Sequence, residues 1–363
     1  MYLKSLSLQD YRNYSQLHIE LSPHINVIYG LNAQGKSNLI EAIAYLVAGK
    51  SFRGHHERDL VQEGKPYFLV EGHVAEGSSR QLKITWNPKD GKHYFVDGTS
   101  IRSLRRYIGN FHAVVFEPKD VMFFQEEPRL RREFIDDEYG AISPSYYFAI
   151  QQYLTLLKER NEAIKTTLDE ILDRVYRERL VTLGIEIRAK RKRFLEELGR
   201  YFQEFFQGIY GEMLRIELCY LPNIPDNYAT EEDVHAYWLQ VLDHERRLQL
   251  TQVGPHRDDF QVLLNGKDIA IYGSQGQQRI AVVALKLALI RYIDVHVGSD
   301  SIVLLDDVLS ELDHVRRNRL IQEVQNHHQV VLTLTQRDVL AETLLDEAQI
   351  IEVEHGQIQI KES

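Results

Sequence analysis

The sequence predicts an α/β fold that is interrupted by a mainly helical insertion. Strand-like and helix-like segments alternate at both ends of the chain, whereas residues from about 119 to 210 have helical periodicity. The sequence has a glycine-rich loop near its beginning and two acids that follow a strand near its end. These two features usually occur together in one binding site, yet about 270 residues separate them here. We therefore expect one α/β lobe built from residues 1–118 and 271–363, with a mainly helical lobe, residues 119–270, between its halves.

Length and composition agree with two lobes. The chain has 363 residues, of which 44% are hydrophobic and 26% are charged, which is enough for two cores. The single cysteine, Cys219, excludes an internal disulfide framework and a cysteine-based structural zinc site. The best apolar run, Ile280–Ile290, contains Lys286 and is shorter than the roughly 18 residues that cross a bilayer. Since the first residues also lack a signal peptide's apolar core, the sequence predicts a cytoplasmic protein with no membrane partner.

The charge distribution leaves the macromolecular partner open. The formal net charge of −10 taken alone argues against nucleic acid, but the placement of the charges matters more than their sum. Between Arg174 and Arg193 there are eight basic residues and two acidic ones, Glu178 and Glu186. An ordinary solvated helix face explains this run as well as a DNA-binding stripe does. The candidate contacts to DNA phosphates are Arg188, Lys190, Arg191, Lys192 and Arg193.

The first half of the α/β lobe begins with strands and a helix. Apolar or alternating segments predict strands at Tyr2–Leu8, Leu17–Leu21 and Ile25–Tyr29. Helical spacing of apolar residues begins at Ser37 and stops at Gly49, which is typical of a helix C-cap. Residues 67–116 return to a strand-like pattern and end with the apolar strand Ala113–Phe116.

The insertion carries a heptad-like run of apolar residues. The run consists of Leu154, Leu157, Ile164, Leu168, Ile171 and Val175. It covers too few heptads for an extended coiled coil, so we interpret it as core stripes of packed helices. A further helix is expected around Asp233–Leu248, and the strand Phe260–Leu264 leads into a hairpin turn at Asn265-Gly266.

The second half of the α/β lobe alternates between helices and strands. The predicted elements are a helix from Gln277 to about Val295, a strand Ile302–Leu305, a helix Arg316–Gln325, a strand Gln329–Thr335 and a hairpin around His355-Gly356. An α/β unit that is interrupted and then resumed is the simplest architecture that accommodates them.

A phosphate-binding loop follows the third predicted strand. The segment Gly30–Ser37 matches G-x-x-x-x-G-K-[ST] at every fixed position, with a strand before it and a helix after it. Glycines allow backbone angles that turn successive N–H groups toward phosphates, and the helix start adds unpaired donors. Lys36 is expected to reach the β- and γ-phosphates of ATP, and Ser37 to bind Mg²⁺. The predicted ATP-binding residues here are Gly30, Asn32, Ala33, Gln34, Gly35, Lys36, Ser37 and Asn38.

Two acids end the apolar strand Ile302–Leu305. Asp306 fits the carboxylate that holds Mg²⁺ at a strand end, together with Ser37. Asp307 is placed to orient or activate the attacking water, so we assign it, with Lys36, a catalytic role. An apolar strand that ends in two aspartates is common by itself, and the phosphate loop is what makes the pair informative.

A third motif opens the helix that precedes the acidic strand. In the segment Ser274–Arg279, Ser274 and Gln277 fit a helix capping box, which is the purely structural interpretation. The segment also resembles the signature motif of ABC-type ATPases. That resemblance implies that Ser274, Gly276 and Gln277 contact the γ-phosphate of ATP bound to an opposite subunit. Ser310–Asp313 resembles the D-loop of these ATPases, but Thr333-Leu334-Thr335 stands where they usually have a switch histidine.

Six segments spread along nearly the whole chain match the pattern of one known family. They are Leu8–Tyr14, Lys50–Arg53, Arg160-Asn161, Gly254–Asp259, Ser274–Arg279 and Leu304–Asp313. Through these segments the chain resembles the RecF family, an SMC-like branch of the ABC-type ATPase heads. The segment Phe116–Asp136 departs from the family pattern, with Lys119 where an acid is usual and Glu126 where a glycine is usual. The contacts of that loop are therefore not transferred from the family.

The resemblance implies an ATP-dependent DNA-binding protein of recombinational repair and DNA replication, linked to the SOS response. It implies a slow, DNA-dependent ATPase that uses Mg²⁺, dimerises with ATP on double-stranded and gapped DNA, and works with RecR and RecO to load RecA. The alternative is the ATP-binding subunit of an ABC transporter. A transporter subunit would have a shorter gap between loop and acids, an L-S-G-G-Q signature, glutamate at 307 and histidine after the last core strand, which this sequence lacks.

Overall fold

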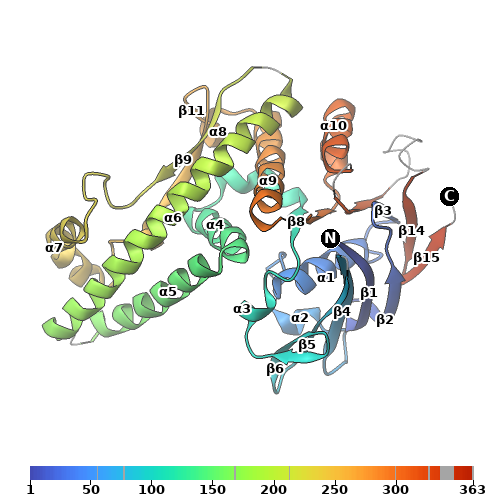
Figure 1. The fold of residues 1–363 in the computed structure, drawn as a ribbon, viewed down its shortest axis with the longest axis horizontal. Helices are drawn as coiled ribbons and strands as arrows, with labels where there is room; N and C mark the ends of the chain where they lie inside the picture. Colours follow the sequence, from blue (N-terminus) through green and yellow to red (C-terminus); the bar gives the residue numbers. More distant parts are fainter. Residues whose placement is uncertain are drawn as a thin grey trace. The chain divides into compact units, whose positions relative to one another are not determined.

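The computed structural model separates the chain into two compact units (Figure 1). It describes residues 1–54, 56–76, 78–166, 169–211, 213–298, 300–325, 328–335 and 347–361. The first unit comprises Met1–Asp120, Gly208–Tyr210 and Leu289–Ser363, and the second comprises Val121–Gln207 and Gly211–Ala288. The first division lies close to the expected limit at 118/119. The second lies well after 270/271, because it falls inside the continuous helix α9 (Gln275–Val297) rather than before that helix.

The first unit contains an antiparallel six-stranded sheet in the order β2-β1-β4-β5-β6-β7. Its strands are β1 (Tyr2–Tyr11), β2 (Tyr14–Glu20), β4 (Phe68–Glu76), β5 (Ser78–Asn87), β6 (Gly91–Val96) and β7 (Thr99–Ile101). The strand-like pattern over 67–116 is thereby confirmed for most of its length. Two short helices, α2 (Glu57–Leu60) and α3 (Leu104–Tyr107), lie between strands of this unit in the chain.

The second sheet of this unit has the order β15-β14-β3-β13-β12-β8. Its strands are β3 (Ile25–Tyr29), β8 (Ala113–Phe116), β12 (Ile302–Leu305), β13 (Val330–Leu334), β14 (Gln349–Glu354) and β15 (Gln357–Lys361). Every neighbouring pair is parallel except β14 and β15, which form the predicted terminal hairpin. The continuous apolar runs of β12 and β13 are typical of parallel strands that are buried on both faces.

Helix α1 (Lys36–Ala48) packs against strands of both sheets. Apolar side chains on most of its circumference are buried, as expected for a helix that lies between two layers. It ends at Gly49, whose φ of 66° is the left-handed conformation that the sequence predicts for the C-cap. Between β12 and β13 lie the short 3-10 turn Leu309–Glu311 and the helix α10 (His314–Gln325).

The second unit is mainly helical. Its elements are the 3-10 segment Pro118–Gln125, which begins in the first unit, then α4 (Pro128–Ile142), α5 (Pro144–Ile164), α6 (Glu170–Tyr210), α7 (Glu231–Leu248), the 3-10 turn Pro255–Arg257, α8 (Ile269–Tyr272) and α9. A small antiparallel sheet, β11-β10-β9, is formed by β9 (Ile216–Leu221), β10 (Asp259–Leu264) and β11 (Lys267–Asp268). The turn at Asn265-Gly266 has positive φ at both residues, as the predicted two-residue hairpin requires.

The heptad-like run does not form one core stripe. It is divided between α5 and α6, and Leu168 lies outside the described residues. Leu154, Ile171 and Val175 are exposed to 41%, 68% and 43%, so the prediction that they line the core is wrong. The core of this unit is instead built from other faces of the helices, with Tyr146, Tyr153, Leu180, Ile187 and Trp238 among its buried side chains. The connection between α5 and α6 interrupts the heptad spacing, so apolar residues before and after it do not lie on one common buried face.

A buried arginine holds three segments of the second unit together. Arg160 of α5 donates to Asp173 of α6 at 3.0 Å, to Glu245 of α7 at 2.8 Å and to the Thr251 hydroxyl at 2.7 Å. Its guanidinium also lies 5.0 Å from the centre of the Trp238 ring. Arg160, Asp173 and Glu245 are all buried, so the positive charge of the arginine is needed to compensate the two carboxylates, and the carboxylates to compensate the arginine.

A half-buried histidine contacts Tyr153 of the same core. His256 Nε2 is 3.1 Å from the Thr251 carbonyl oxygen and therefore donates to it, while Nδ1, at 2.6 Å, accepts from the Tyr153 hydroxyl. These contacts define a neutral imidazole. Burial, aided by the nearby Arg257, lowers the pKa of His256 from 6.5 to about 4, although the bond to Thr251 opposes that shift.

This pKa shift predicts a loss of stability in acid. Between about pH 6.5 and 4 the unfolded chain binds a proton at residue 256 that the folded chain does not, so the free energy of unfolding falls as the pH falls. For His256→Gln, the drop in that free energy between pH 7 and 4.5 should be smaller by about 2 kcal/mol. Urea denaturation at several pH values measures this. The control His244→Gln, which changes an exposed imidazole on α7, should keep the wild-type pH dependence; equal slopes in all three proteins would contradict the assignment.

Candidate nucleotide site

The loop between β3 and α1 has the backbone that a phosphate loop needs. Ala33 has φ 65° and Gly35 has φ 118°, so the chain turns through left-handed conformations before the helix starts. A Cβ atom at Gly30 would lie 2.3 Å from the carbonyl oxygen of Val353, which makes glycine necessary there. The loop is thus shaped by close backbone packing as well as by its glycines.

Two turns from distant parts of the sequence hold this loop. Asn13 Nδ2 donates to the Gln34 carbonyl at 3.0 Å, and the Tyr14 hydroxyl donates to the Gly35 carbonyl at 3.0 Å. From the terminal hairpin, the His355 amide donates to Gln34 Oε1 at 2.6 Å. The segment Leu8–Tyr14, which carries part of the family resemblance, therefore has a structural role in positioning the phosphate loop.

The helix that follows the loop is anchored by a buried ion pair. Arg12 donates to both oxygens of Glu41 at 2.9 Å, and the Ser51 hydroxyl donates to Glu41 Oε1 at 2.6 Å. The Glu41 side chain is fully buried, and that of Arg12 is 16% exposed. Sequence reasoning missed Glu41, because one acid on an apolar helix carries no local signal of its partner.

The Lys36 ammonium is folded onto the loop itself. Its Nζ donates to the carbonyl oxygens of Gly30 at 2.7 Å and Leu31 at 2.9 Å. Burial lowers the pKa of Lys36, and attraction to Asp307 and Asp306 opposes that shift. The ammonium thus lies within the loop that would surround the phosphates, at the end of the sheet where both acids lie.

The structure brings the predicted magnesium ligands into direct contact. The Ser37 hydroxyl donates to Asp306 Oδ1 at 2.7 Å, across 269 positions of sequence. The Asp306 amide donates to the Phe116 carbonyl at 2.9 Å, which fixes the start of the acidic pair at the end of β12. A hydroxyl and a carboxylate oxygen at this separation are the hard donors that Mg²⁺ takes, so these residues fit the ion.

Thr333 joins the two acids, and sequence reasoning assigned it no role. Its hydroxyl donates to Asp306 Oδ1 at 3.0 Å and accepts from the Asp307 amide at 2.8 Å. The available sequence signal was a threonine inside the otherwise apolar strand β13. Asp307 has φ 53°, a left-handed conformation that costs energy for a residue other than glycine and is held here by its neighbours. The Ser310 hydroxyl, from the D-loop-like segment, donates to the Asp307 carbonyl at 2.8 Å.

The signature-like segment begins α9 in the predicted capping box. The Gln277 amide donates to Ser274 Oγ at 3.2 Å, and the Ser274 amide donates to Gln277 Oε1 at 2.9 Å. Ser274 is exposed, and Gly276 and Gln277 are half-buried. The predicted helix capping box is therefore confirmed, whereas contact with a γ-phosphate stays a prediction.

Gln278 fixes the loop that carries Ser274, and the sequence analysis did not single it out. Its buried side-chain amide donates to the carbonyl oxygens of Ile269 at 3.0 Å and Gly273 at 3.1 Å. Its oxygen accepts from Gln125 Nε2 at 2.8 Å. The short helix α8 and the turn before Ser274 are thus held by one side chain, and no local pattern distinguishes Gln278 from its neighbours Gln275 and Gln277.

The predicted DNA-contacting residues of α6 have different environments. Arg191 is buried and donates to Asp136 at 2.7 Å and to the Pro255 carbonyl at 2.6 Å, so the prediction that it contacts DNA is wrong. Arg188 is paired with Asp226, and Lys190 with Glu186 at 2.6 Å.

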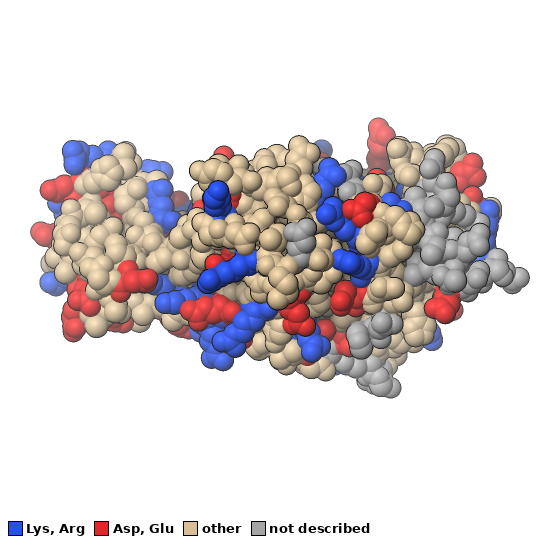
Figure 2. All heavy atoms as spheres, turned by 90° about the horizontal axis from the view of Figure 1, so that it is seen from above, with Lys and Arg blue, Asp and Glu red and all other residues tan. Residues whose placement is uncertain are grey.

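Lys192 and Arg193 are the exposed members of this set. Arg193 has Glu197 at 2.9 Å. On the face shown in Figure 2, basic and acidic side chains are interspersed rather than gathered by sign. Because Arg191 is buried and Arg188, Lys190 and Arg193 each have an acidic partner, a DNA contact at this helix would depend on a few cations.

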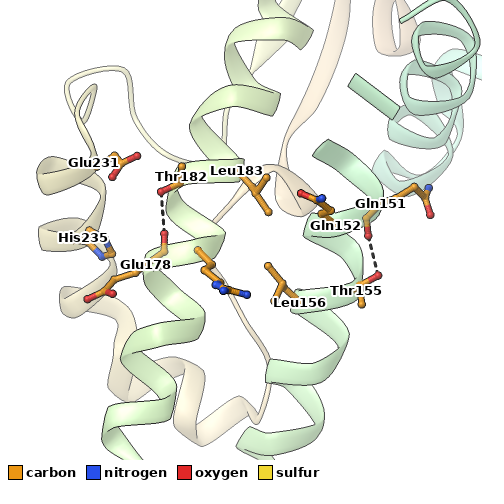
Figure 3. A pocket seen from close by; sticks show the side chains of 10 residues that line it. Gln151, Gln152, Thr155, Leu156, Glu178, Thr182, Leu183, Glu231 and His235 are labelled. Atoms are coloured by element: carbon orange, nitrogen blue, oxygen red, sulfur yellow. Dashed lines mark hydrogen bonds between the residues drawn. The ribbon is translucent and has the colours of Figure 1, made fainter. Parts of the chain in front are cut away.

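A separate groove lies between helices α5, α6 and α7 of the second unit. It has a volume of about 880 Å³, and Gln152, Glu178, Arg179 and His235 are among its lining residues (Figure 3). Its lining contains none of the residues predicted to bind ATP or Mg²⁺. Within the described part of the chain, no helix is long and apolar enough to cross a membrane.

Known proteins resemble the chain over its full length. The family described as RecF/RecN/SMC N terminal domain matches residues 2–360. The DNA replication and repair protein RecF of Halalkalibacterium halodurans is 36% identical over 372 residues, covering 99% of this chain and all of that protein. The corresponding protein of Lactobacillus delbrueckii subsp. bulgaricus is 34% identical over 376 residues, covering 100% of this chain and 98% of its own length.

A solved structure agrees with these relatives. The recombination mediator protein RecF-ATPrS in the RecFOR pathway superposes with a TM-score of 0.92 at 31% identity, covering 99% of this chain and 98% of that one. Because these relatives are DNA replication and repair proteins, the alternative reading as a transporter subunit is not supported. The expected α/β class with a helical insertion is confirmed.

The Arg12–Glu41 pair predicts a large stability effect at the site. Arg12→Ala leaves the buried Glu41 carboxylate without its cation and should lower the free energy of unfolding by about 3 kcal/mol, as measured by urea denaturation. The control Lys65→Ala removes a cation that is 47% exposed and lies 3.4 Å from Asp10, so it should cost less than about 1 kcal/mol. Similar losses in the two variants would show that the buried pair does not anchor α1.

Proposed function

The chain belongs to the RecF family, and on that premise we propose that it is an ATP-dependent DNA-binding protein of replication and recombinational repair. The observation that carries this proposal is the contact between Ser37, at the end of the phosphate loop, and Asp306, at the end of β12. A loop alone would bind phosphates, but a loop hydrogen-bonded to a strand-end carboxylate is built for a nucleotide with a divalent cation.

In this proposal ATP is bound by Gly30 and by residues 32–38 of the loop. The loop amides and the start of α1 would receive the phosphates, and Lys36 would exchange its two carbonyl contacts for β- and γ-phosphate oxygens. Ser37 and Asp306 would hold Mg²⁺, which supplies charge neutralisation on the phosphates when it is bound. Thr333 keeps the Asp306 carboxylate turned toward Ser37.

Hydrolysis is assigned to Asp307. Its carboxylate would orient a water molecule for attack on the γ-phosphorus, so that the bond to the bridging oxygen breaks and ADP and phosphate are released. Thr333 and Ser310 hold the backbone of Asp307 in its left-handed conformation, which sets the direction of its side chain. We propose slow turnover that depends on DNA, so that hydrolysis acts as a release step.

The proposed ATP-bound state is a two-fold symmetric dimer. The chain has one phosphate loop and one signature-like segment, and Ser274 of a second copy would complete the site around Lys36. ATP then binds the dimer better than the monomer, and this difference in affinity is what favours dimerisation. Loss of the γ-phosphate removes the group that both copies contact.

The proposed setting is a gap in damaged DNA in the cytoplasm. RecR and RecO are the proposed partners, and loading of RecA is the proposed outcome, in keeping with the RecFOR pathway named for the similar structure. The remaining candidate phosphate contacts are Arg188, Lys190, Lys192 and Arg193, of which the last two are exposed.

Two substitutions separate ATP binding from dimerisation. Lys36→Ala removes the ammonium and should abolish both ATP binding and hydrolysis. Ser274→Arg should leave ATP binding by the monomer intact and block dimerisation, because a bulky cation takes the position of the γ-phosphate. Isothermal titration with ATP and sedimentation with Mg-ATP measure the two steps. A Ser274→Arg protein that still dimerises with ATP would rule out the shared site, and normal turnover by folded Lys36→Ala would place the nucleotide elsewhere.

DNA binding should depend steeply on salt in spite of the negative net charge. The variant Lys192→Ala/Arg193→Ala removes two candidate phosphate contacts, so the slope of log K against log salt should become shallower by about 2. Fluorescence anisotropy with a gapped duplex and Mg-ATP measures this. The matched control Arg246→Ala/Arg247→Ala removes two exposed cations from α7 and should keep the wild-type slope. An unchanged slope in the α6 variant would assign the contacts to another face.

A further inference from the structure

Three metal-ligating side chains converge in the first unit, away from the nucleotide ligands. Asp294 lies near the end of α9, Asp300 just before β12, and His328 just before β13. One ligand atom from each lies within 4.8 Å of the other two. Since β12 and β13 are parallel neighbours, this cluster is at their amino ends, whereas Asp306 and Thr333 are at their carboxyl ends.

The hydrogen bond of His328 fixes which nitrogen faces the acids. Nδ1 is 3.2 Å from the Ser301 carbonyl oxygen, which can only accept, so the proton is on Nδ1. Nε2 then faces Asp294 Oδ2 at 3.3 Å. A lone pair and a carboxylate oxygen repel each other unless a cation, either a proton or a metal ion, lies between them. A backbone carbonyl on the other ring nitrogen is the arrangement that metal-binding histidines usually have.

The carboxylate beside this histidine has an unsatisfied oxygen. Asp294 Oδ1 is fully enclosed and has no hydrogen-bond partner among the described residues, although the other oxygen contacts His328. The hydroxyl of Ser301, a fully buried residue next to Asp300, likewise has no partner within the described part of the chain. A buried carboxylate oxygen without a donor is costly, and a bound cation would compensate it.

We propose that Asp294, Asp300 and His328 bind a Zn²⁺-type transition-metal ion. One imidazole nitrogen with two carboxylate oxygens suits Zn²⁺ better than Mg²⁺ or Ca²⁺, which take oxygen ligands. Ligand atoms about 2.0–2.1 Å from a tetrahedral ion are about 3.3 Å apart, which is the distance observed between His328 Nε2 and Asp294 Oδ2. With three protein ligands, water completes the coordination.

The ion would clamp the end of α9 to the starts of two core strands. Asp300 is 54% exposed and has the Met1 amine at 3.5 Å, so it can turn from that weak contact to an ion. The exposed Asp300 places the site at the protein surface, and the His328 side chain, which is only 6% exposed, forms its buried wall. The role is structural, because the three side chains lie at the amino ends of β12 and β13 or near the end of α9, whereas the acids of the nucleotide site follow the carboxyl end of β12.

Cobalt binding to the full-length, nucleotide-free protein tests the proposal. After treatment with EDTA, one equivalent of Co²⁺ should produce the visible absorption of a four-coordinate site, and Zn²⁺ should displace it. Asp300→Asn and His328→Gln should each weaken binding by about tenfold or more.

Two control variants locate the ion. Glu323→Gln, which changes an exposed acid on α10, and Asp306→Asn, which removes the predicted Mg²⁺ carboxylate, should both keep the cobalt spectrum. Far-UV circular dichroism verifies that each protein is folded. No four-coordinate absorption in the wild type, or equal binding by wild type, Asp300→Asn and His328→Gln, would overturn the proposal, and loss of the signal only in Asp306→Asn would assign the ion to the nucleotide site.

Discussion

Parallel pairing of β3, β13 and β12 places the residues that follow these strands along one edge of a sheet, and the nucleotide site depends on it. The phosphate loop follows β3, and Asp306 and Asp307 follow β12. Thr333, near the end of the strand between them, contacts both acids. Because the strand order brings Ser37 and Asp306 together, an insertion of any length between the two halves is compatible with the same site.

The nucleotide site also depends on contacts within the protein that hold the phosphate loop in place. Helix α1 is enclosed between two sheets, so its N-terminus cannot move without disturbing both. Asn13, Tyr14 and His355 hold the loop from outside, and the Arg12–Glu41 pair anchors the helix behind it. These contacts preorganise the phosphate site, which reduces the entropy that ATP binding must overcome.

The helical unit is specified by buried charges as much as by apolar packing. Arg160 and Arg191 are both buried, and each bonds to carboxylates or carbonyls from other segments. Such groups are poor sources of net stability, but they strongly disfavour arrangements in which their charges are left uncompensated. Arg191 belongs to a basic run in the sequence, but its burial and its bonds make it unavailable to a nucleic acid, whereas its neighbours Lys192 and Arg193 are exposed.

The sequence by itself determined the parts of this protein whose chemistry is local. The turn between β3 and α1, the apolar strands β3, β8 and β12, and the hairpin turns were predicted correctly because glycine, strand periodicity and helix caps act over a few residues. Phosphate binding by this turn stays a prediction. Only the tertiary structure decided which distant side chains meet. Thr333 at the acids, Glu41 beneath Arg12 and Gln278 behind Ser274 have no local signature, and the heptad-like run failed because a helix face is buried only if another segment covers it.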